Sequence, residues 1–160
     1  MPFETRFGDF RLSDDLRRFD LIRGHGWISR ESYWAAGIPF DIFARSVRGS
    51  LSIGAYAPAG GMVAMARVVT DRATFGWICD VFVARGVRGR GLGKAIMSYI
   101  GAHPDLQGLR RMHLATRDAP DLYAQFGFAP LTGVDRWMEV RLADPYGLTR
   151  ETQSAPASAK

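Results

Sequence analysis

The alternation of apolar and polar residues along the chain predicts a series of short strands. The longest apolar run, Phe75–Val83, is rich in Phe, Trp, Ile and Val, so we expect a central strand buried on both faces. Two earlier strands flank Pro58-Ala59-Gly60-Gly61, a turn sequence that indicates a hairpin. The other expected strands are Phe10–Leu12, Leu51–Ala57, Met62–Thr70, Arg111–Ala115 and Arg136–Arg141.

Apolar residues at helical spacing predict helices between these strands, and proline or glycine marks several of their ends. The expected helices are Leu16–Trp34 with an interruption near Gly24 and Gly26, a second that starts at Pro39, a third from about Gly91 to Ala102, and a short one over Ala119–Phe126. A length of 160 residues fits one domain with a substantial core. We assign residues 1–148 to this domain and expect the small, polar tail over residues 149–160 to be disordered.

The charge of the chain suits anionic ligands. The net charge is +5 and arises chiefly from arginine, with a concentration at Arg85, Arg88, Arg90 and Lys94. Because this concentration lies inside a glycine-rich segment, it favours a local phosphate site over a broad nucleic-acid surface. Nucleic-acid binding is therefore the weakest of the functions considered.

Other features of the composition point to a cytoplasmic protein. The single cysteine, Cys79, excludes an intrachain disulfide and fits a reducing compartment. No apolar run approaches the length of a membrane span, and the N-terminus lacks the basic start and apolar stretch of a signal peptide. We expect no membrane partner.

The glycine-rich segment lies between the expected central strand and the third helix. Gly89, Gly91 and Gly93 can take positive φ angles and let a ligand approach the backbone closely. The helix that follows presents free N–H groups and the positive end of its dipole. Together with the basic side chains of Arg88, Arg90 and Lys94, these groups predict a cradle for an anion such as a pyrophosphate.

Two well-known nucleotide loops do not fit this segment. A Walker loop needs glycine where Arg88 stands and a hydroxyl residue where Ala95 stands. A dinucleotide fingerprint needs its third glycine one residue later than Gly93 and an acidic residue about 20 positions on, which is not found.

The loop Arg88-Gly89-Arg90-Gly91-Leu92-Gly93 resembles the Arg/Gln-x-x-Gly-x-Gly/Ala signature of the GNAT superfamily of N-acetyltransferases. A second match follows, because Leu122-Tyr123-Ala124-Gln125-Phe126-Gly127-Phe128 is similar to that family's Leu-Tyr-x-x-x-Gly-Phe. The resemblance extends over about residues 51–140, and two positions depart from the pattern: Arg85 stands where proline is common and Thr116 where asparagine is common. Small bacterial acetyltransferases also share Ser32-Tyr33-Trp34, Gly37-Ile38-Pro39 and Leu109-Arg110-Arg111.

This resemblance implies a fold and a donor. The fold is α+β, with a central mixed, mostly antiparallel sheet flanked by about four helices and acyl-CoA in the splay between two central strands. The donor is acetyl-CoA as a co-substrate, with no metal. The resemblance places it against Val81, Phe82, Val83, Arg88, Gly89, Arg90, Gly91, Leu92, Gly93, Lys94 and Thr116.

The resemblance also implies how the acetyl group is transferred. A backbone N–H of the central strand, that of Val83, polarises the thioester carbonyl, and a neutral amine attacks directly. Tyr123 then protonates the departing thiolate as general acid, the alternative being a tyrosine that only packs. Asp80 interrupts an apolar strand and is either a base or water-orienting group for the proton that the amine loses, or a structural carboxylate bonded to arginine or to backbone amides. Cys79, alternating with Trp77 and Val81 on one strand face, is read as a packed small residue rather than a nucleophile.

The acceptor is a small-molecule or peptide amine, and Tyr33 and Trp34 lie where this family forms the wall of its acceptor site. An acyl-CoA-binding regulatory or interaction module without catalysis is the alternative function, motivated by Arg85 and Thr116. An exposed final strand could support a homodimer.

Overall fold

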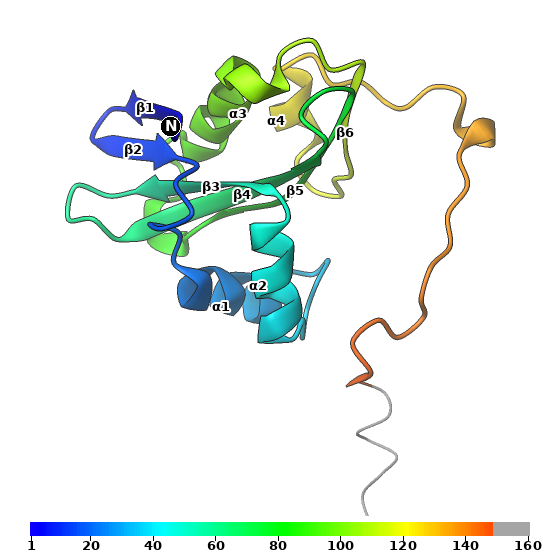
Figure 1. Cartoon of the computed structure of the whole chain (residues 1–160), viewed down its shortest axis with the longest axis horizontal. Coiled ribbons are helices and arrows are strands. Elements are labelled where there is room, and N and C mark those ends of the chain that lie inside the picture. The colour runs from blue at the N-terminus through cyan, green and yellow to red at the C-terminus, as the bar shows by residue number, and fades with distance from the viewer. Residues whose placement is uncertain (149–160) are drawn as a thin grey trace, which may run out of the picture.

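The computed structural model describes residues 1–148, which form one mixed sheet with helices on both faces (Figure 1). The strand order is β1-β2-β3-β4-β5-β6, and neighbouring strands are antiparallel except for the parallel pair β5 and β6. The strands are β1 Glu4–Phe7, β2 Phe10–Ser13, β3 Leu51–Tyr56, β4 Met62–Thr70, β5 Phe75–Val83 and β6 Arg111–Leu114.

Four helices cover the sheet, two on each of its faces, with one apolar core under each pair. They are α1 Leu21–Glu31, α2 Phe40–Arg48, α3 Leu92–Ala102 and α4 Pro120–Ala124, with short 3₁₀ turns at Arg85–Val87, Pro104–Leu106 and Val134–Arg136. The α3 helix packs on one face of the sheet through Leu92, Ile96 and Ile100, and α1 and α2 pack on the other through Ile28, Phe43 and Val47 (Figure 1). No helix within residues 1–148 is long and apolar enough to span a membrane.

The predicted α+β architecture is confirmed, as are the β3–β4 hairpin, the central position of β5 and the helix that follows the glycine loop. The first helix differs from the prediction, because it begins at Leu21 and runs without a break through Gly24 and Gly26. Gly24 is a site of close packing: a Cβ there would lie 3.1 Å from the ring of Phe43 and 3.2 Å from the sulfur of Met65. The side chain of Asp20 caps the helix by accepting the N–H of Arg23 at 2.9 Å.

Two terminal elements also differ. The sequence did not indicate β1, whose residues are mostly exposed and therefore lack an alternating apolar pattern. The strand predicted at Arg136–Arg141 is wrong, since Val134–Arg136 is a 3₁₀ turn and residues 137–142 pair with no strand among residues 1–148. The segment instead runs apart from the sheet (Figure 1). The tail assigned to residues 149–160 lies outside the described residues.

The expectation that β5 is buried on both faces is only partly correct, because each half of the strand buries one face most deeply. Residues 76, 78, 80 and 82 are buried, whereas Trp77 is exposed and the other residues are partly exposed. The alternation also changes face at Asp80: Ile78 and Val81 both contact the core under α3, and Phe82 belongs to the core under α1 and α2. Cys79 and Val81 therefore do not share a face, because the strand carries a β-bulge between them.

Candidate active site

The parallel strands β5 and β6 separate halfway along β5. Their register runs only from Phe75 opposite Arg111 to Ile78 opposite Leu114, and β5 then continues to Val83 while the chain after Leu114 turns towards α4. A cavity of about 820 Å³ opens where they diverge. Residues 79–83 line it on the β5 side and residues 114–119 on the other side, so the predicted splay is present as a physical opening.

A β-bulge in β5 lies at the point of divergence. Met65 of β4 faces Phe82 and Arg67 faces Cys79, so Ala66 alone stands opposite both Asp80 and Val81. Asp80 takes the bulge in the left-handed region, with φ 51°, which aspartate tolerates better than most residues. Beyond the bulge, residues 81–83 all border the cavity.

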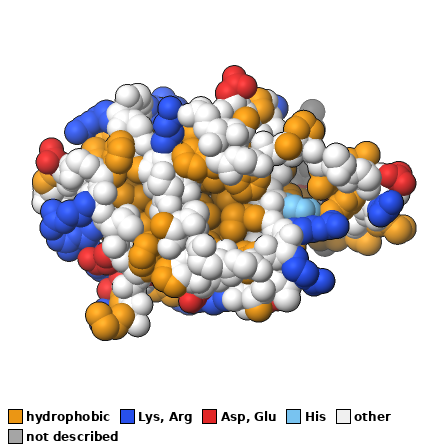
Figure 2. Space-filling view, turned by 90° about the horizontal axis from the view of Figure 1, so that it is seen from above, with side chains coloured by type: hydrophobic (Ala, Val, Ile, Leu, Met, Phe, Trp, Pro, Cys, Tyr) orange, Lys and Arg blue, Asp and Glu red, His pale blue; other side chains and the backbone are white. Residues whose placement is uncertain are grey.

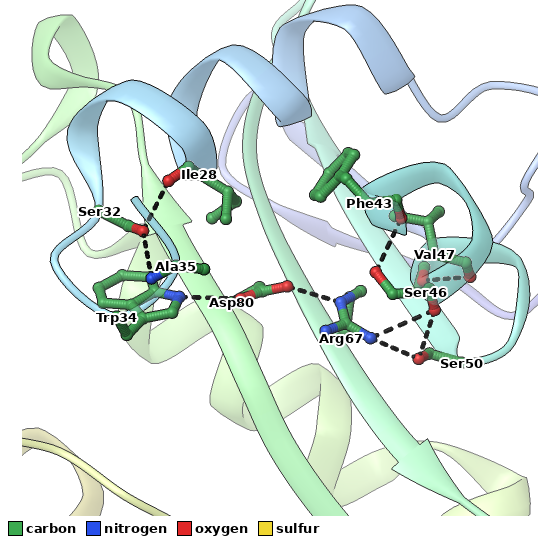
Figure 3. A network of polar contacts seen from close by, with 11 residues as sticks. Ile28, Ser32, Trp34, Ala35, Phe43, Ser46, Val47, Ser50, Arg67 and Asp80 are labelled. Atoms are coloured by element: carbon green, nitrogen blue, oxygen red, sulfur yellow. Dashed lines mark hydrogen bonds and ion pairs between the residues drawn. The ribbon is translucent and has the colours of Figure 1, made fainter. Parts of the chain in front are cut away.

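The buried side chain of Asp80 is fully engaged. One carboxylate oxygen accepts a hydrogen bond from Nε of Arg67 at 2.6 Å, and the other accepts one from Nε1 of Trp34 at 2.8 Å (Figure 3). Arg67 also donates to the carbonyl of Ser46 at 3.2 Å and to the hydroxyl of Ser50 at 2.7 Å, at the end of α2. Of the two roles considered for Asp80, these contacts match that of a carboxylate bonded to arginine.

Tyr33 and Trp34 follow α1 and cover one side of the cavity. Their rings meet edge to face at 5.0 Å, and the guanidinium of Arg117 lies 3.7 Å from the centre of the Tyr33 ring. The N–H of Arg117 also donates to the Tyr33 hydroxyl at 3.3 Å. The loop after α1 thereby reaches the loop after β6, and both predicted acceptor residues line the same cavity as Asp80.

Tyr123 lies on α4 at the opposite side of the same cavity and is half-buried. Burial is the main cause that raises its pKa, and the negative charge of Asp118 adds to the effect. The phenol therefore stays protonated to a more alkaline pH than an ordinary tyrosine.

The glycine loop begins beside the cavity and leads into α3. Gly89 and Gly91 have φ angles of 77° and 82°, and the helix starts after Gly91 without a side-chain cap, so its first N–H groups remain available to an anion. Arg88 donates through Nε to the carbonyl of Val83 at 2.9 Å and lines the cavity, as does Gly93. Leu92 is buried in the core, so only its backbone can serve a ligand.

The other residues predicted to bind acetyl-CoA differ in whether they line this cavity. Thr116 lines the cavity, and its hydroxyl oxygen accepts the N–H of Ala119 at 3.1 Å, which leaves its own proton to donate. Gly89, Arg90 and Lys94 are exposed and lie outside the cavity lining, on the stretch between Arg88 and the first turn of α3. The guanidinium of Arg90 lies over the Phe10 ring at 4.6 Å.

Sequence reasoning missed Arg67 and Arg117. Arg67 did leave a signal, because it is the only charged residue in the apolar strand Met62–Thr70 and a buried charge requires a partner. Arg117 left none that distinguishes it from other loop arginines. Within residues 1–148, no cluster of His, Cys, Asp and Glu side chains has the arrangement that holds a metal ion.

Comparison with known proteins places these features in a family. Residues 51–130 match the family model of the acetyltransferase (GNAT) domain. A crystal structure from Xanthomonas campestris pv. campestris, assigned to the GNAT family as an acetyltransferase, is 41% identical with a TM-score of 0.84, over 88% of this chain and 99% of that one. A Gibberella zeae protein named as an acetyltransferase is 26% identical over 139 residues, which is 74% of this chain and 77% of its own.

A third similarity concerns the fold alone. A Clostridium acetobutylicum structure described as an acetyltransferase with acetyl-CoA has a TM-score of 0.50 and 15% identity, over 64% of this chain and 71% of that one.

Proposed function

The chain belongs to the GNAT acetyltransferase family, and from this premise we propose that it moves the acetyl group of acetyl-CoA to a primary amine by direct attack, with Tyr123 as general acid. One observation carries the proposal. The bulged half of β5, the start of the glycine loop and Tyr123 all face a single cavity between β5 and β6.

The donor would lie along this cavity. We assign its pyrophosphate to the loop from Arg88 to Lys94, where the N–H groups at the start of α3 meet basic side chains. Its pantetheine arm would pair with the backbone of Val81–Val83 in the manner of an added strand, since β6 no longer occupies that side of β5. The hydroxyl of Thr116 faces the same space and can donate to the arm.

The chemical step then needs two contributions from the chain, one from the N–H of Val83 and one from Tyr123. The N–H of Val83 polarises the thioester carbonyl, the neutral amine nitrogen forms a bond to the carbonyl carbon, the carbon–sulfur bond breaks, and the nitrogen releases its extra proton to water to leave the amide. Tyr123 gives its proton to the departing thiolate; a tyrosine phenol is protonated at neutral pH at its ordinary pKa, and burial raises that pKa further.

We propose that Asp80 positions the acceptor wall rather than acting as the base. Its two oxygens accept hydrogen bonds from Arg67 and Trp34, and the bond from Trp34 fixes the indole beside the cavity. Trp34 in turn supports the ring of Tyr33, which lies against Arg117. The acceptor amine would enter past these two rings, and the acceptor is a small-molecule or peptide amine.

The test is a CoA-release assay against a panel of amines, with mass spectrometry of the product. We expect one class of primary amine to release CoA and gain 42 Da, the mass that acetylation adds to any amine. Tyr123→Phe should abolish most of this turnover, while Tyr56→Phe, which alters a buried hydroxyl outside the cavity, should not. Binding of acetyl-CoA without acetylation of any amine in the panel would contradict the proposal.

A further inference from the structure

Arg117 brings to the cavity a positive charge that no acidic side chain neutralises. It is exposed and lines the cavity between β5 and β6, on the loop that follows β6. Its guanidinium lies 3.7 Å from the centre of the Tyr33 ring and makes no hydrogen bond or ion pair with any residue from 1 to 148. The N–H groups of the guanidinium are therefore free to donate to a ligand.

The surroundings of Arg117 hold its guanidinium in place. The backbone N–H of Arg117 donates to the Tyr33 hydroxyl at 3.3 Å, and the N–H of Ala119 closes the turn by donating to the hydroxyl of Thr116 at 3.1 Å. The Tyr33 ring in turn lies edge to face against Trp34 at 5.0 Å. A guanidinium stacked on an aromatic ring keeps its N–H edge open, so this position is prepared for an anion.

Most other charged side chains that line the cavity are paired or already assigned. Glu31 accepts a hydrogen bond from Arg85 at 3.1 Å, and Asp80 accepts one from Arg67 at 2.6 Å. Arg88 lies at the start of the glycine loop, where we assign the pyrophosphate. Among the described residues, the two lining charges that remain without a hydrogen bond or ion pair are neighbours on the loop after β6.

Asp118 is the acidic member of this pair. Its charge acts at the reacting end of the cavity, since burial and then the charge of Asp118 are the main causes that raise the pKa of Tyr123. A primary amine arrives from water as a cation, which such a carboxylate attracts. Consecutive residues, Arg117 and Asp118, thus offer one site for an anion and one for a cation. A molecule that carries both charges would match them.

The distribution of basic side chains disfavours a polyanionic acceptor. On the face seen in Figure 2 they lie in separate groups around the margin, while hydrophobic side chains gather near the middle. A nucleic acid or another polyanion is recognised by a continuous basic surface. The charge pattern suits a ligand with one anionic group instead.

We propose that the acceptor bears a carboxylate as well as its primary amine, and that Arg117 binds this carboxylate. The inference rests on the proposed acetyl transfer and narrows its acceptor to an amino carboxylate. The planar guanidinium matches the two oxygens of a carboxylate. A phosphate carries up to about two negative charges, which suits one free guanidinium beside Asp118 less well. Arg117 is thus a specificity-determining residue that directs the amine of the acceptor towards Tyr123.

The experiment compares each acceptor with its own amide in the CoA-release assay. The panel contains the common amino acids, short peptides with glutamate as second residue, and amino phosphates; the two kinds of carboxylate distinguish a free amino acid from a peptide. An amide has nearly the shape of a carboxylate but no charge. We expect the preferred amino carboxylate to have a kcat/KM at least about 10-fold above that of its amide, the usual effect of a hydrogen bond to a charged group.

Arg117→Gln should remove this preference. We expect the KM of the preferred acceptor to rise about 10–100-fold, while the kinetics with its amide and the KM of acetyl-CoA stay unchanged. Arg117→Lys keeps the charge without the fork and should recover part of the preference. Arg48→Gln is the matched control, because Arg48 is an exposed arginine at the end of α2 and outside the cavity. A damaged fold would affect acid and amide alike, so the comparison isolates the contact with the carboxylate.

Three results would overturn the inference while acetyl transfer stands. They are equal use of acids and amides, an equal loss of both in Arg117→Gln, and a preference for an amino phosphate. If no amine is acetylated, the proposed function fails, and calorimetry on the CoA-bound protein tests the anion site by itself. N-acetylated amino acids should then bind more tightly than their amides, and Arg117→Gln should abolish the difference. Equal binding of the two would overturn the inference as well.

Discussion

Arg67 and Asp80 face each other from neighbouring strands, with Nε of the arginine 2.6 Å from a carboxylate oxygen of the aspartate and both side chains nearly buried. This pair spans the bulge that redirects β5 towards the cavity. It also connects the end of α2, through Ser46 and Ser50, with Trp34 at the edge of the cavity. One ion pair thus joins the core of the sheet to the rim of the active site (Figure 3).

Removal of the arginine should destabilise the protein strongly. Arg67→Met leaves the Asp80 carboxylate buried without its cation, so we expect the free energy of unfolding to fall by about 3–5 kcal/mol. Arg72→Met is the matched control, because Arg72 pairs with Asp105 at the exposed surface and such pairs contribute about 0–1 kcal/mol. Urea unfolding followed by circular dichroism measures both. Equal losses in the two variants would show that burial of the Arg67 pair adds nothing.

Asp80→Asn separates the positioning role from that of a base. Asparagine tolerates the left-handed backbone at this residue, but its single acceptor oxygen stays with the charged Arg67, so the hydrogen bond from Trp34 is lost, and it cannot take the proton of the amine. We expect the KM of the acceptor to rise several-fold while kcat keeps its pH profile and the KM of acetyl-CoA is unchanged. Trp34→Phe, which removes the same hydrogen bond from the other side, should produce the same pattern.

The role of Asp80 as base predicts a different outcome. In that case Asp80→Asn would lower kcat by orders of magnitude and would remove the fall of kcat at acidic pH. Trp34→Phe would do neither. Steady-state kinetics across pH for both variants distinguishes the two roles.

Much of the cavity side that we propose for acetyl-CoA could be predicted from the sequence, because its residues are close together in the chain. The bulged strand end, the glycine loop and the start of α3 are consecutive from Asp80 to Lys94, so spacing along the chain reflects spacing in the fold. The bulge itself could not be predicted, since it depends on the register between β4 and β5. This is also why Cys79 and Val81 were placed on one face of the strand.

The side of the cavity that we propose for the acceptor amine is assembled from residues far apart in the chain. Arg67 contacts Asp80 across a strand pair, and Arg117 contacts Tyr33 across the cavity. No short sequence motif predicts contacts between residues so far apart in the chain. Residues 137–142 illustrate a different limit: their alternation is that of a strand, but alternation alone does not place a segment beside a strand edge, and these residues pair with no strand in the described chain.

Tyr123→Phe should lower kcat by about 100-fold or more, the usual contribution of a general acid. A tyrosine phenol is protonated through neutral pH, and burial raises the pKa of Tyr123, so kcat should fall only at a pH above the ordinary titration range of tyrosine. Kinetics from neutral to alkaline pH measures this fall in kcat, which should be absent in Tyr123→Phe. Tyr56→Phe is the control, since the buried Tyr56 hydroxyl has no hydrogen-bond partner in the described chain and its loss should not reduce stability or kcat. Unchanged kcat in Tyr123→Phe would remove Tyr123 from the proton-donor role.

Gly91→Ala should damage the donor site and the fold together. The residue has a φ of 82°, and a Cβ there would lie 2.9 Å from the Phe7 ring. We expect a loss of about 1–2 kcal/mol in stability from the backbone alone, and weaker binding of CoA because α3 starts at this residue. Gly86→Ala in the same loop has an ordinary backbone and open space around it, so it should change neither property. Calorimetric titration with CoA and thermal unfolding measure both, and equal effects of the two substitutions would contradict the role assigned to Gly91.

Cys79 should be unreactive in the folded protein. Burial raises the pKa of its thiol to about 11, so the thiolate that alkylating reagents require is scarce below that pH. We expect iodoacetamide at pH 8 to label the native protein far more slowly than the urea-unfolded protein, with the native rate rising as pH approaches 11. Cys79→Ala should keep kcat within a few-fold, because direct attack by the amine needs no acetyl-cysteine intermediate. Fast native labelling at pH 8, or a mass gain of one acetyl group on Cys79 during turnover, would instead indicate transfer through the thiol.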